Sequence, residues 1–363
     1  MFVKDIQLVN FRNYENIYFQ PNQQMNIFYG QNAQGKTNLL EAIYFLLRAK
    51  SFRTNSEKQA ISFNKDQSFV RGRIEVFGFD YIYEVKISQH NPKKIRINEE
   101  AISNISQYSE KSPCVLFRPE DLNMVKEGPN LRRDFIDNLI DQVDPSYEIL
   151  LRRYNRVMFQ RNIILKKNQD PSLLRVYQDQ LVDLGSRIIK KRYESLEAFK
   201  KYAKKYHFFI SYEREKLDLS YETKISYQTS LENMKRDYQE AFNQSLENDL
   251  NLRRTSFGPH RDDLKIYINN KEAKDFASQG QQRSVLLSFK LAEVVYIERE
   301  AGQKPVLLLD DVFSELDQKR KKLFLNAIGT CQTFITTTDQ VVQIQKIVPD
   351  SSVYSINQNK LFS

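Results

Sequence analysis

The sequence predicts an α/β protein in which the two ends of the chain build one head and a helical arm is inserted between them. A strand, a glycine-rich loop and a helix follow one another before residue 48, and a very apolar strand lies near the other end, at 305–309. The stretch between 119 and 250 is charged, tyrosine-rich and helical in pattern. We therefore expect three segments: 1–118 and 251–363 as the two halves of the head, and 119–250 as the arm.

Composition narrows the class of protein. The 363 residues are 40% hydrophobic and 28% charged, which supplies enough apolar material for a core and excludes a disordered chain. No run approaches the ~20 apolar residues of a membrane span, and the N-terminus lacks the basic-then-apolar order of a signal peptide. Two cysteines are too few for a disulfide framework or a zinc site. We expect a cytoplasmic protein with no membrane partner.

The formal net charge of +9 is concentrated in one part of the chain. Residues 151–210 contain fifteen lysines and arginines and five acidic residues, a net charge of +10, so the rest of the chain is nearly neutral. Apolar residues recur there at helical spacing, so one face is expected to pack and the basic face to point outward. Such a segment favours a polyanion, since each phosphate contact releases counterions. A solvated helical face explains the same charge equally well.

The head elements are predicted in chain order. Alternating apolar residues predict half-buried strands at 3–8 and 24–29, and the apolar run at 38–47 has the length of a buried helix. Strand character returns at 81–87 and 94–97. The uninterrupted apolar run Val306–Leu309 is typical of a strand buried on both faces of a sheet.

The loop between the second strand and the first helix matches G-x-x-x-x-G-K-[ST] without a mismatch. Glycines let the backbone fold around phosphates, whose charge then meets N–H groups and a helix N-terminus. Lys36 is predicted to reach the β- and γ-phosphates and to act in catalysis, and the Thr37 hydroxyl to complete the Mg²⁺ shell. The predicted nucleotide-binding residues here are Gly30, Gln31, Asn32, Ala33, Gln34, Gly35, Lys36 and Thr37.

Two acids follow the apolar strand near the other end. A P-loop protein needs a carboxylate at the end of a neighbouring strand to hold magnesium, and Asp310 is predicted to be this metal residue. Asp311 follows on the opposite side of the strand end, where its carboxylate could orient or deprotonate the water that attacks ATP. Two exposed acids opening a turn are the structural alternative.

A second anion site is predicted where Ser278-Gln279-Gly280-Gln281 opens an apolar helix. A small hydroxyl residue and a glycine at a helix N-terminus favour a negatively charged ligand. Ser278, Gly280 and Gln281 are the residues predicted to bind nucleotide there.

These loops, in this order and followed by Ser314-Glu315-Leu316-Asp317, resemble the ATP-binding-cassette (ABC) fold. The more specific resemblance is to the RecF family of bacterial recombination-mediator ATPases, which is related to the SMC-type proteins. The segments that carry it cover nearly the whole chain: Gly30–Asn38, Ser51–Thr54, Phe117–Leu122, Arg132–Asp137, Gln160–Asn162, Gly258–Asp263, Ser278–Arg283 and Leu309–Asp317.

The resemblance implies an ABC-type head that binds ATP and Mg²⁺ and closes as a homodimer. The signature loop of each head, Ser278–Arg283, would contact the γ-phosphate bound by the other head. It further implies binding to double-stranded DNA at gaps and single-strand/double-strand junctions. RecO and RecR would be partners in loading recombinase onto single strands, with links to replication restart and the SOS response.

Three departures from the common cassette pattern favour ATP as a switch for binding over ATP as fuel, and together with the resemblance they imply a weak, DNA-stimulated ATPase. Asp311 stands where a glutamate is usual, and Pro119-Glu120-Asp121 replaces the glutamine loop. Hydroxyls of Thr336–Thr338 stand where many relatives have a histidine.

The roles of two side chains are left undecided by the sequence. Arg53 could approach nucleotide and DNA or form a surface salt bridge. His260 could be catalytic or, as we favour, structural.

Two other classes of function fit part of the pattern. The ATPase subunit of a transporter shares the three ATP loops, but it has a shorter helical insertion and the +10 segment argues against it. A DNA-binding module with a vestigial ATPase is the other class. Against it, Lys36, Thr37, Asp310 and Ser278 are all present.

Overall fold

The computed structural model describes residues 1–54, 56–103, 105–109, 112–167, 171–329, 331–338 and 341–362. It divides into two compact units. The head unit comprises Met1–Leu122 and Phe289–Ser363, and the arm unit comprises Asn123–Ser288. The chain ends thus share one unit, while the division into three segments at 118 and 250 stays a prediction.

A mostly parallel sheet forms the part of the head unit that carries the predicted loops. Neighbouring strands follow the order β15-β14-β3-β13-β12-β8, and only the β15–β14 pair is antiparallel. Their bounds are β3 (Met25–Tyr29), β8 (Cys114–Phe117), β12 (Val306–Asp310), β13 (Thr333–Thr337), β14 (Ser352–Asn357) and β15 (Lys360–Phe362). Every residue of β12 and β13 is buried, as expected for strands covered on both faces.

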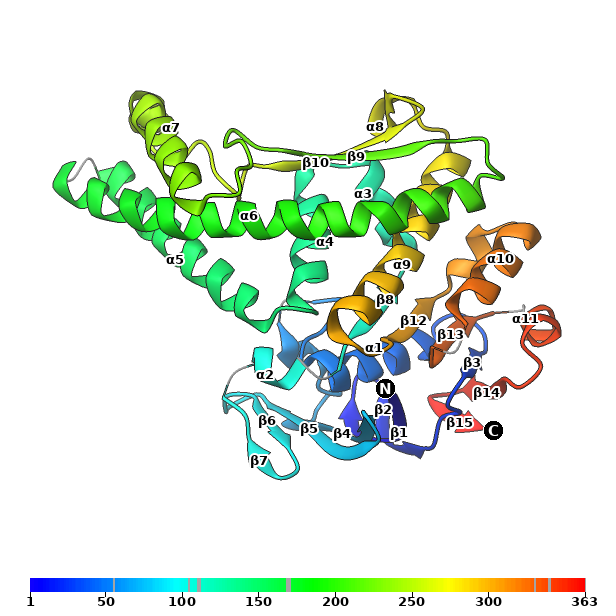
Figure 1. The fold of residues 1–363 in the computed structure, drawn as a ribbon. Helices are drawn as coiled ribbons and strands as arrows, with labels where there is room; N and C mark the ends of the chain where they lie inside the picture. The colour runs from blue at the N-terminus through cyan, green and yellow to red at the C-terminus, as the bar shows by residue number, and fades with distance from the viewer. Residues whose placement is uncertain are drawn as a thin grey trace. The chain divides into compact units, whose positions relative to one another are not determined.

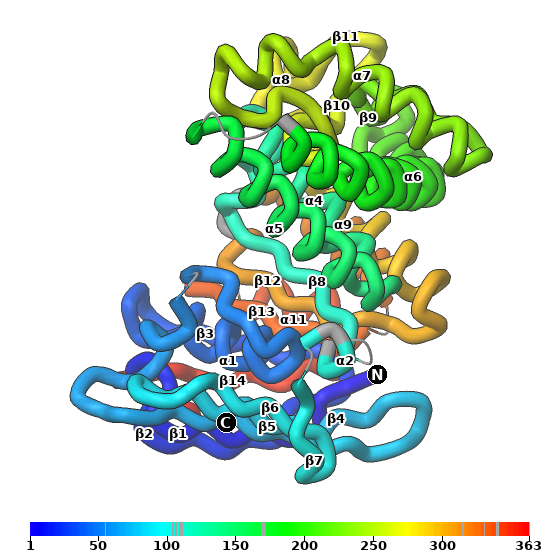
Figure 2. The backbone as a smooth tube through the Cα atoms, turned by 90° about the vertical axis from the view of Figure 1, so that its left-hand side faces the viewer, coloured from blue at the N-terminus to red at the C-terminus, as the bar shows by residue number. Residues whose placement is uncertain are grey.

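An antiparallel sheet forms the second layer of the head unit, in the order β2-β1-β4-β5-β6-β7. Helix α1 (Lys36–Arg48) shares a continuous hydrophobic core with strands of both sheets, and Figures 1 and 2 show it between the two layers. The strands are β1 (Phe2–Phe11), β2 (Tyr14–Phe19), β4 (Gln67–Val76), β5 (Phe79–Ser88), β6 (Lys94–Ile97) and β7 (Glu100–Ala101).

The remaining elements of the head unit are short. They are η1 (Glu57–Ala60), α2 (Ile105–Ser109), η2 (Pro119–Leu122), η3 (Val312–Glu315), α10 (Gln318–Ile328) and α11 (Val341–Ile347). The strands and the helix predicted for the head are confirmed as β1, β3, α1, β5, β6 and β12. The side chains of Ser314 and Glu315 lie outside the part of the chain that is described.

The arm unit is helical around one small sheet. Its helices are α3 (Asn123–Lys126), α4 (Pro129–Asp141), α5 (Pro145–Lys167), α6 (Pro171–Ile210), α7 (Leu231–Leu252) and α8 (Ala273–Phe276). Its antiparallel strands are β9 (Leu217–Glu222), β10 (Asp263–Ile268) and β11 (Lys271–Glu272). Helices α5 and α6 meet where α5 ends and α6 begins and then diverge (Figure 1). Helix α9 (Gln279–Ala301) begins in this unit and ends in the head unit.

The structure corrects the reading of 119–250 as wholly helical, since β9 lies within it. Leu217 and Leu219 point into the core and alternate with more exposed residues, a period-2 pattern too short to stand out between charged helices. No helix among the described residues is both long and apolar enough to cross a membrane.

Candidate nucleotide site and basic arm

The glycine-rich loop occupies the turn between β3 and α1. Gly35 has φ +104° and immediately precedes α1, a backbone conformation that favours glycine. A Cβ there would lie 2.7 Å from the Asn13 amide nitrogen and 2.8 Å from the Tyr14 hydroxyl. A Cβ at Gly30 would collide with the main-chain oxygen of Ile356 on β14. The loop is therefore held between β2 and β14, with the N–H groups of the first turn of α1 available to an anion.

Lys36 lies over this loop. Its ammonium donates hydrogen bonds to the main-chain oxygens of Gly30 (2.6 Å) and Gln31 (2.9 Å). Burial lowers the pKa of Lys36, and the nearby carboxylates of Asp311 and Asp310 oppose that shift. The charges of both acids of the other half of the head thus act on this ammonium, whose hydrogen bonds are to loop oxygens that a phosphate can replace.

Asp310 is the point where the two halves of the head meet. Thr37 and Thr336 both donate to Asp310 Oδ1, at 2.9 and 2.8 Å. Burial raises the pKa of Asp310, while these two hydroxyls counteract the shift. The hydroxyl of Thr37 and the carboxylate of Asp310 are adjacent hard oxygen donors, the ligand set that suits Mg²⁺ together with phosphate and water oxygens. The two residues predicted to bind metal therefore fit that role.

Asp311 follows at the start of η3. Its φ is +50°, and its N–H donates to the hydroxyl of Thr336 at 2.9 Å. Thr336 therefore holds both acids, the first by its side chain and the second by its backbone. The sequence predicts hydroxyls in place of a histidine on this strand, but it gives no signal that Thr336 orients both acids.

The first helix is anchored by a buried carboxylate. Glu41 is fully buried and accepts hydrogen bonds from Arg12 (2.9 and 2.7 Å) and from Ser51 (2.6 Å). Arg53 lies 3.6 Å from Glu41 and donates to the Asn38 side chain at 2.5 Å. Arg53 thus forms an ion pair beside the P-loop helix, and its charge also reaches Asp310, whose pKa is set first by burial.

Pro119-Glu120-Asp121, the segment that replaces the glutamine loop, belongs to the head unit and carries two acids of its own. Asp121 accepts from the Arg118 N–H at 3.1 Å and lies 3.4 Å from the Lys290 ammonium. The charge of Glu120 raises the pKa of Asp310, after the larger effect of burial. The charge of Glu120 therefore acts on Asp310, while Asp121 pairs with Lys290.

The signature loop lies at the beginning of α9, in the part of that helix assigned to the arm unit. The Ser278 hydroxyl accepts from the Gln281 N–H at 3.3 Å, and the Ser278 N–H donates to Gln281 Oε1 at 2.9 Å. This reciprocal arrangement has the geometry of a capping box. A Cβ on Gly280 would find only the Ser278 hydroxyl, 4.0 Å away, so the loop surface is open there.

His260 belongs to a buried polar cluster of the arm unit. Its Nδ1 lies 2.8 Å from the Tyr154 hydroxyl, and burial lowers its pKa to about 4. Burial raises the pKa of the neighbouring Asp262 to about 6, although Tyr221 donates to its carboxylate at 2.6 Å. Arg192 donates to the main-chain oxygen of Pro259 at 2.6 Å. These contacts lie among scaffold residues, in agreement with the structural interpretation that we favour for His260.

The structure pairs some of the fifteen cations of 151–210 with acids and leaves others exposed to solvent. Several are paired with acids outside the segment: Arg161 with Asp249 (2.7 Å, both fully buried), Arg192 with Asp137 (2.8 Å), and Lys200 and Lys204 with Asp218 (2.8 and 2.9 Å). The charge available to a ligand is therefore smaller than +10. Others are exposed to solvent, among them Arg153, Arg156, Lys166, Lys167, Arg175, Lys201 and Lys205.

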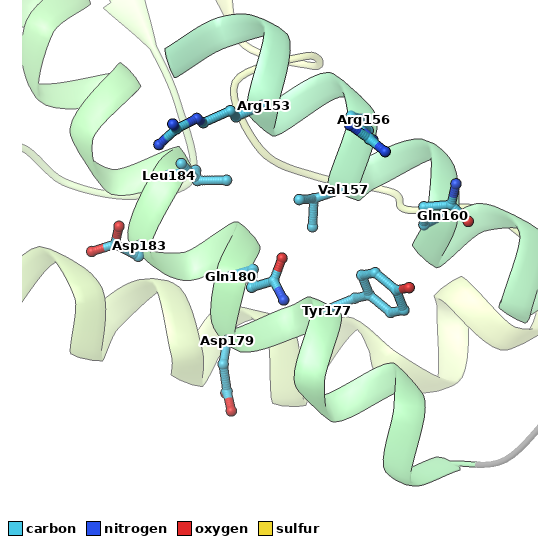
Figure 3. A pocket seen from close by; sticks show the side chains of 9 residues that line it. All are labelled: Arg153, Arg156, Val157, Gln160, Tyr177, Asp179, Gln180, Asp183 and Leu184. Atoms are coloured by element: carbon cyan, nitrogen blue, oxygen red, sulfur yellow. The ribbon is translucent and has the colours of Figure 1, made fainter. Parts of the chain in front are cut away.

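A cavity of about 880 Å³ lies between α5 and α6. Figure 3 shows Arg153 and Arg156 from α5 on one side and Asp179, Gln180 and Asp183 from α6 on the other. The packing face predicted for α6 is present at Leu174, Leu181 and Ile188, which are buried, whereas Leu173 is exposed.

Comparison with known proteins identifies relatives along nearly the whole chain. The family model described as "RecF/RecN/SMC N terminal domain" matches residues 2–360. The protein "DNA replication and repair protein RecF" of Clostridium perfringens is 43% identical over 339 residues, covering 93% of each chain. The protein with the same name in Bacillus cytotoxicus is 40% identical over 344 residues, covering 93% of this chain and 92% of its own.

A solved structure described as "Structure of the recombination mediator protein RecF-ATPrS in RecFOR pathway" superposes with a TM-score of 0.92 at 34% identity. The match covers 99% of this chain and 97% of that one. An Smc head domain from Pyrococcus yayanosii matches with a TM-score of 0.57 at 13% identity, which supports the fold alone. The predicted ABC-type α/β head is confirmed.

Proposed function

This chain belongs to the RecF family, and on that premise we propose that it is an ATP-dependent DNA-binding protein of recombinational repair and replication restart that acts in the cytoplasm. The observation that carries the proposal is the meeting of Thr37, Asp310 and Thr336 beside Lys36. These residues come from the two ends of the chain and form one oxygen-lined site at a phosphate-binding loop. A relative described as "RecF-ATP" matches this chain with a TM-score of 0.90.

In the proposed site, the N–H groups of residues 30–37 and the Lys36 ammonium hold the phosphates of ATP. Thr37 and Asp310 would hold Mg²⁺, which when bound neutralises charge on the phosphate oxygens. Asp311 orients the attacking water and accepts its proton. Because aspartate is one methylene shorter than glutamate, we expect slow hydrolysis that resets a binding switch.

Ser278, Gly280 and Gln281 are proposed to bind the γ-phosphate held by a second copy of the chain, so that ATP closes a homodimer. The exposed arm cations supply the phosphate contacts to duplex DNA at gaps and junctions, without any base code. RecO and RecR are the proposed partners in loading recombinase onto single strands.

The test is the affinity for gapped duplex DNA with and without ATP·Mg²⁺, measured for the wild type, Lys36→Ala and Lys65→Ala. Lys65 is an exposed lysine of the same unit and serves as the matched control. We expect ATP to tighten DNA binding about tenfold for the wild type and Lys65→Ala and not for Lys36→Ala. Equal DNA affinity with and without ATP in the wild type would instead support an arm that binds DNA independently of a vestigial nucleotide site.

A further inference from the structure

Gln281 of the signature loop is held at both ends of its side-chain amide. Its Oε1 accepts from the Ser278 N–H at 2.9 Å, and its Nε2 donates to Glu215 Oε1, also at 2.9 Å. Glu215 lies between α6 and β9, more than sixty residues before the loop. The orientation of Gln281, and through it of Ser278, therefore depends on a carboxylate from a different part of the arm unit.

Glu215 is itself fixed by His207 on the last turn of α6. His207 Nε2 lies 3.1 Å from Glu215 Oε2, and the imidazole is fully buried. A carboxylate can only accept, so Nε2 carries the proton. His207 Nδ1 lies 3.3 Å from the Ser288 hydroxyl on α9, and Ser288 donates to the main-chain oxygen of Ser284 at 2.6 Å. Burial lowers the pKa of His207, which the Glu215 charge opposes.

The turn that presents Glu215 is fixed by its backbone as well. Tyr212 and Glu213 have φ values of +55° and +64°, and the Glu213 N–H donates to the Phe208 oxygen at 2.8 Å. The Glu215 N–H donates to the Ser211 hydroxyl at 3.3 Å. Backbone and side-chain contacts thus tie Glu215 to the end of α6, so a displacement of that helix end reaches Gln281 through two hydrogen bonds.

We propose that Glu215 is a positioning residue for the signature loop, with His207 as its support. Glu215 holds Gln281 so that the Ser278 hydroxyl and the N–H groups at the start of α9 are preorganised for the γ-phosphate of a second copy. The proposal rests on the proposed ATP-dependent homodimer. It deepens that function by making closure depend on α6, the helix that carries the exposed Lys201 and Lys205.

The experiment measures two constants for each variant: the dissociation constant of the dimer in ATP·Mg²⁺ by sedimentation velocity, and the affinity for a fluorescent ATP analogue by titration. For Glu215→Ala we expect the dimer constant to rise about tenfold, because a charge-assisted hydrogen bond is removed. Affinity for the analogue should stay within about twofold, because the phosphate loop belongs to the head unit. Gln281→Ala removes the residue that Glu215 holds, so we expect its dimer constant to rise at least as much, and the Glu215→Ala/Gln281→Ala double variant to be no worse than Gln281→Ala alone.

Conservative and matched variants separate positioning from general damage. In Glu215→Gln the amide oxygen still accepts from Gln281. The new NH₂ group can donate to His207 Nε2 if the imidazole carries its proton on Nδ1 instead. We therefore expect dimerisation near that of the wild type. Glu213→Ala, an exposed acid two residues away, should have no effect. A Glu215→Ala protein that dimerises like the wild type overturns the proposal, as does a Glu215→Gln protein as impaired as Glu215→Ala.

Ser278→Ala distinguishes this inference from the function on which it rests. If the wild type dimerises with ATP and Ser278→Ala does not, while Glu215→Ala does, only the positioning role of Glu215 fails. If the wild type forms no dimer with ATP, the proposed closure fails and the positioning role fails with it. If Glu215→Ala does not fold, Glu215→Asp decides the question, because the shorter side chain withdraws the carboxylate from Gln281 and keeps its charge. A dimer constant like that of the wild type then overturns the proposal.

Discussion

Thr336 donates its hydroxyl to Asp310 Oδ1 at 2.8 Å, from the strand that lies beside the strand of that acid. The same hydroxyl accepts from the Asp311 N–H at 2.9 Å. One threonine therefore sets the direction of the proposed metal ligand and the backbone of the proposed base, two functions that a single substitution can test.

Thr336→Val removes the hydroxyl and keeps the shape of the side chain. We expect the rate of ATP hydrolysis at saturating ATP·Mg²⁺ to fall about tenfold, since both acids lose a hydrogen bond that orients them. Thr336→Ser retains the hydroxyl and should stay within about threefold of the wild type. Steady-state phosphate release measures both, and equal rates for valine and wild type would contradict the role.

Local pattern is enough to propose a nucleotide site, but it does not reveal which distant residues pair around that site. The glycines, Lys36 and Thr37 lie within eight consecutive residues, so their types and spacing alone indicate phosphate binding. Thr336 was noticed only as a hydroxyl, because its value depends on β13 lying beside β12. The Arg161–Asp249 pair joins residues 88 apart, and nothing in the sequence around Arg161 distinguishes a buried cation from a DNA-binding one.

Glu41→Gln tests the anchor of α1. The substitution leaves the Arg12 guanidinium beside a neutral amide in a buried position, and breaking such a pair costs about 3 kcal/mol of unfolding free energy. Urea unfolding at 25 °C measures the change. Glu84→Gln is the control: its partner Arg71 is 44% exposed, so we expect a loss below about 1 kcal/mol. Equal losses for the two variants would remove Glu41 from this role.

The buried cluster of the arm unit predicts opposed pH effects. The folded pKa of Asp262 is raised to about 6, so its contribution to stability is lost as pH rises towards 6. The folded pKa of His260 is lowered to about 4, so its contribution is lost as pH falls from about 6.5 towards 4. Between pH 4 and 6 the two effects nearly cancel in the wild type.

Removing one group exposes the effect of the other. Relative to the wild type, Asp262→Asn should lose stability on acidification from pH 6 to 4, and His260→Gln should gain it, each by up to about 1.4 kcal/mol per pH unit. Urea midpoints across this range measure the difference. Parallel pH profiles for both variants and the wild type would show that the pKa of neither group differs between the folded and unfolded states.

The exposed arginines of α5 test the proposed binding of DNA by the arm. Arg153→Ala/Arg156→Ala removes two exposed cations, and we expect the slope of log affinity against log salt concentration to fall by about one for each phosphate that the variant no longer neutralises. The control is Glu148→Gln/Arg152→Gln, which neutralises an exposed ion pair of the same helix and leaves the net charge unchanged. A slope unaffected by the arginine variant would place the DNA-binding surface elsewhere.

The bracing of the P-loop by β14 has a consequence for how the head forms during synthesis. Gly30 packs against Ile356, and Gln34 accepts from the Gln358 N–H across 324 positions of the chain. Within the described part of the chain, strand β3 pairs with β13 and β14, which are both made after the entire arm unit. During translation, β3 therefore has both edges unpaired. The phosphate-binding loop lacks its contacts with Ile356 and Gln358 over the same period. From the emergence of β3 until residues near 358 are made, the nascent head therefore has unpaired strand edges, and this long interval is the one in which mispairing can occur.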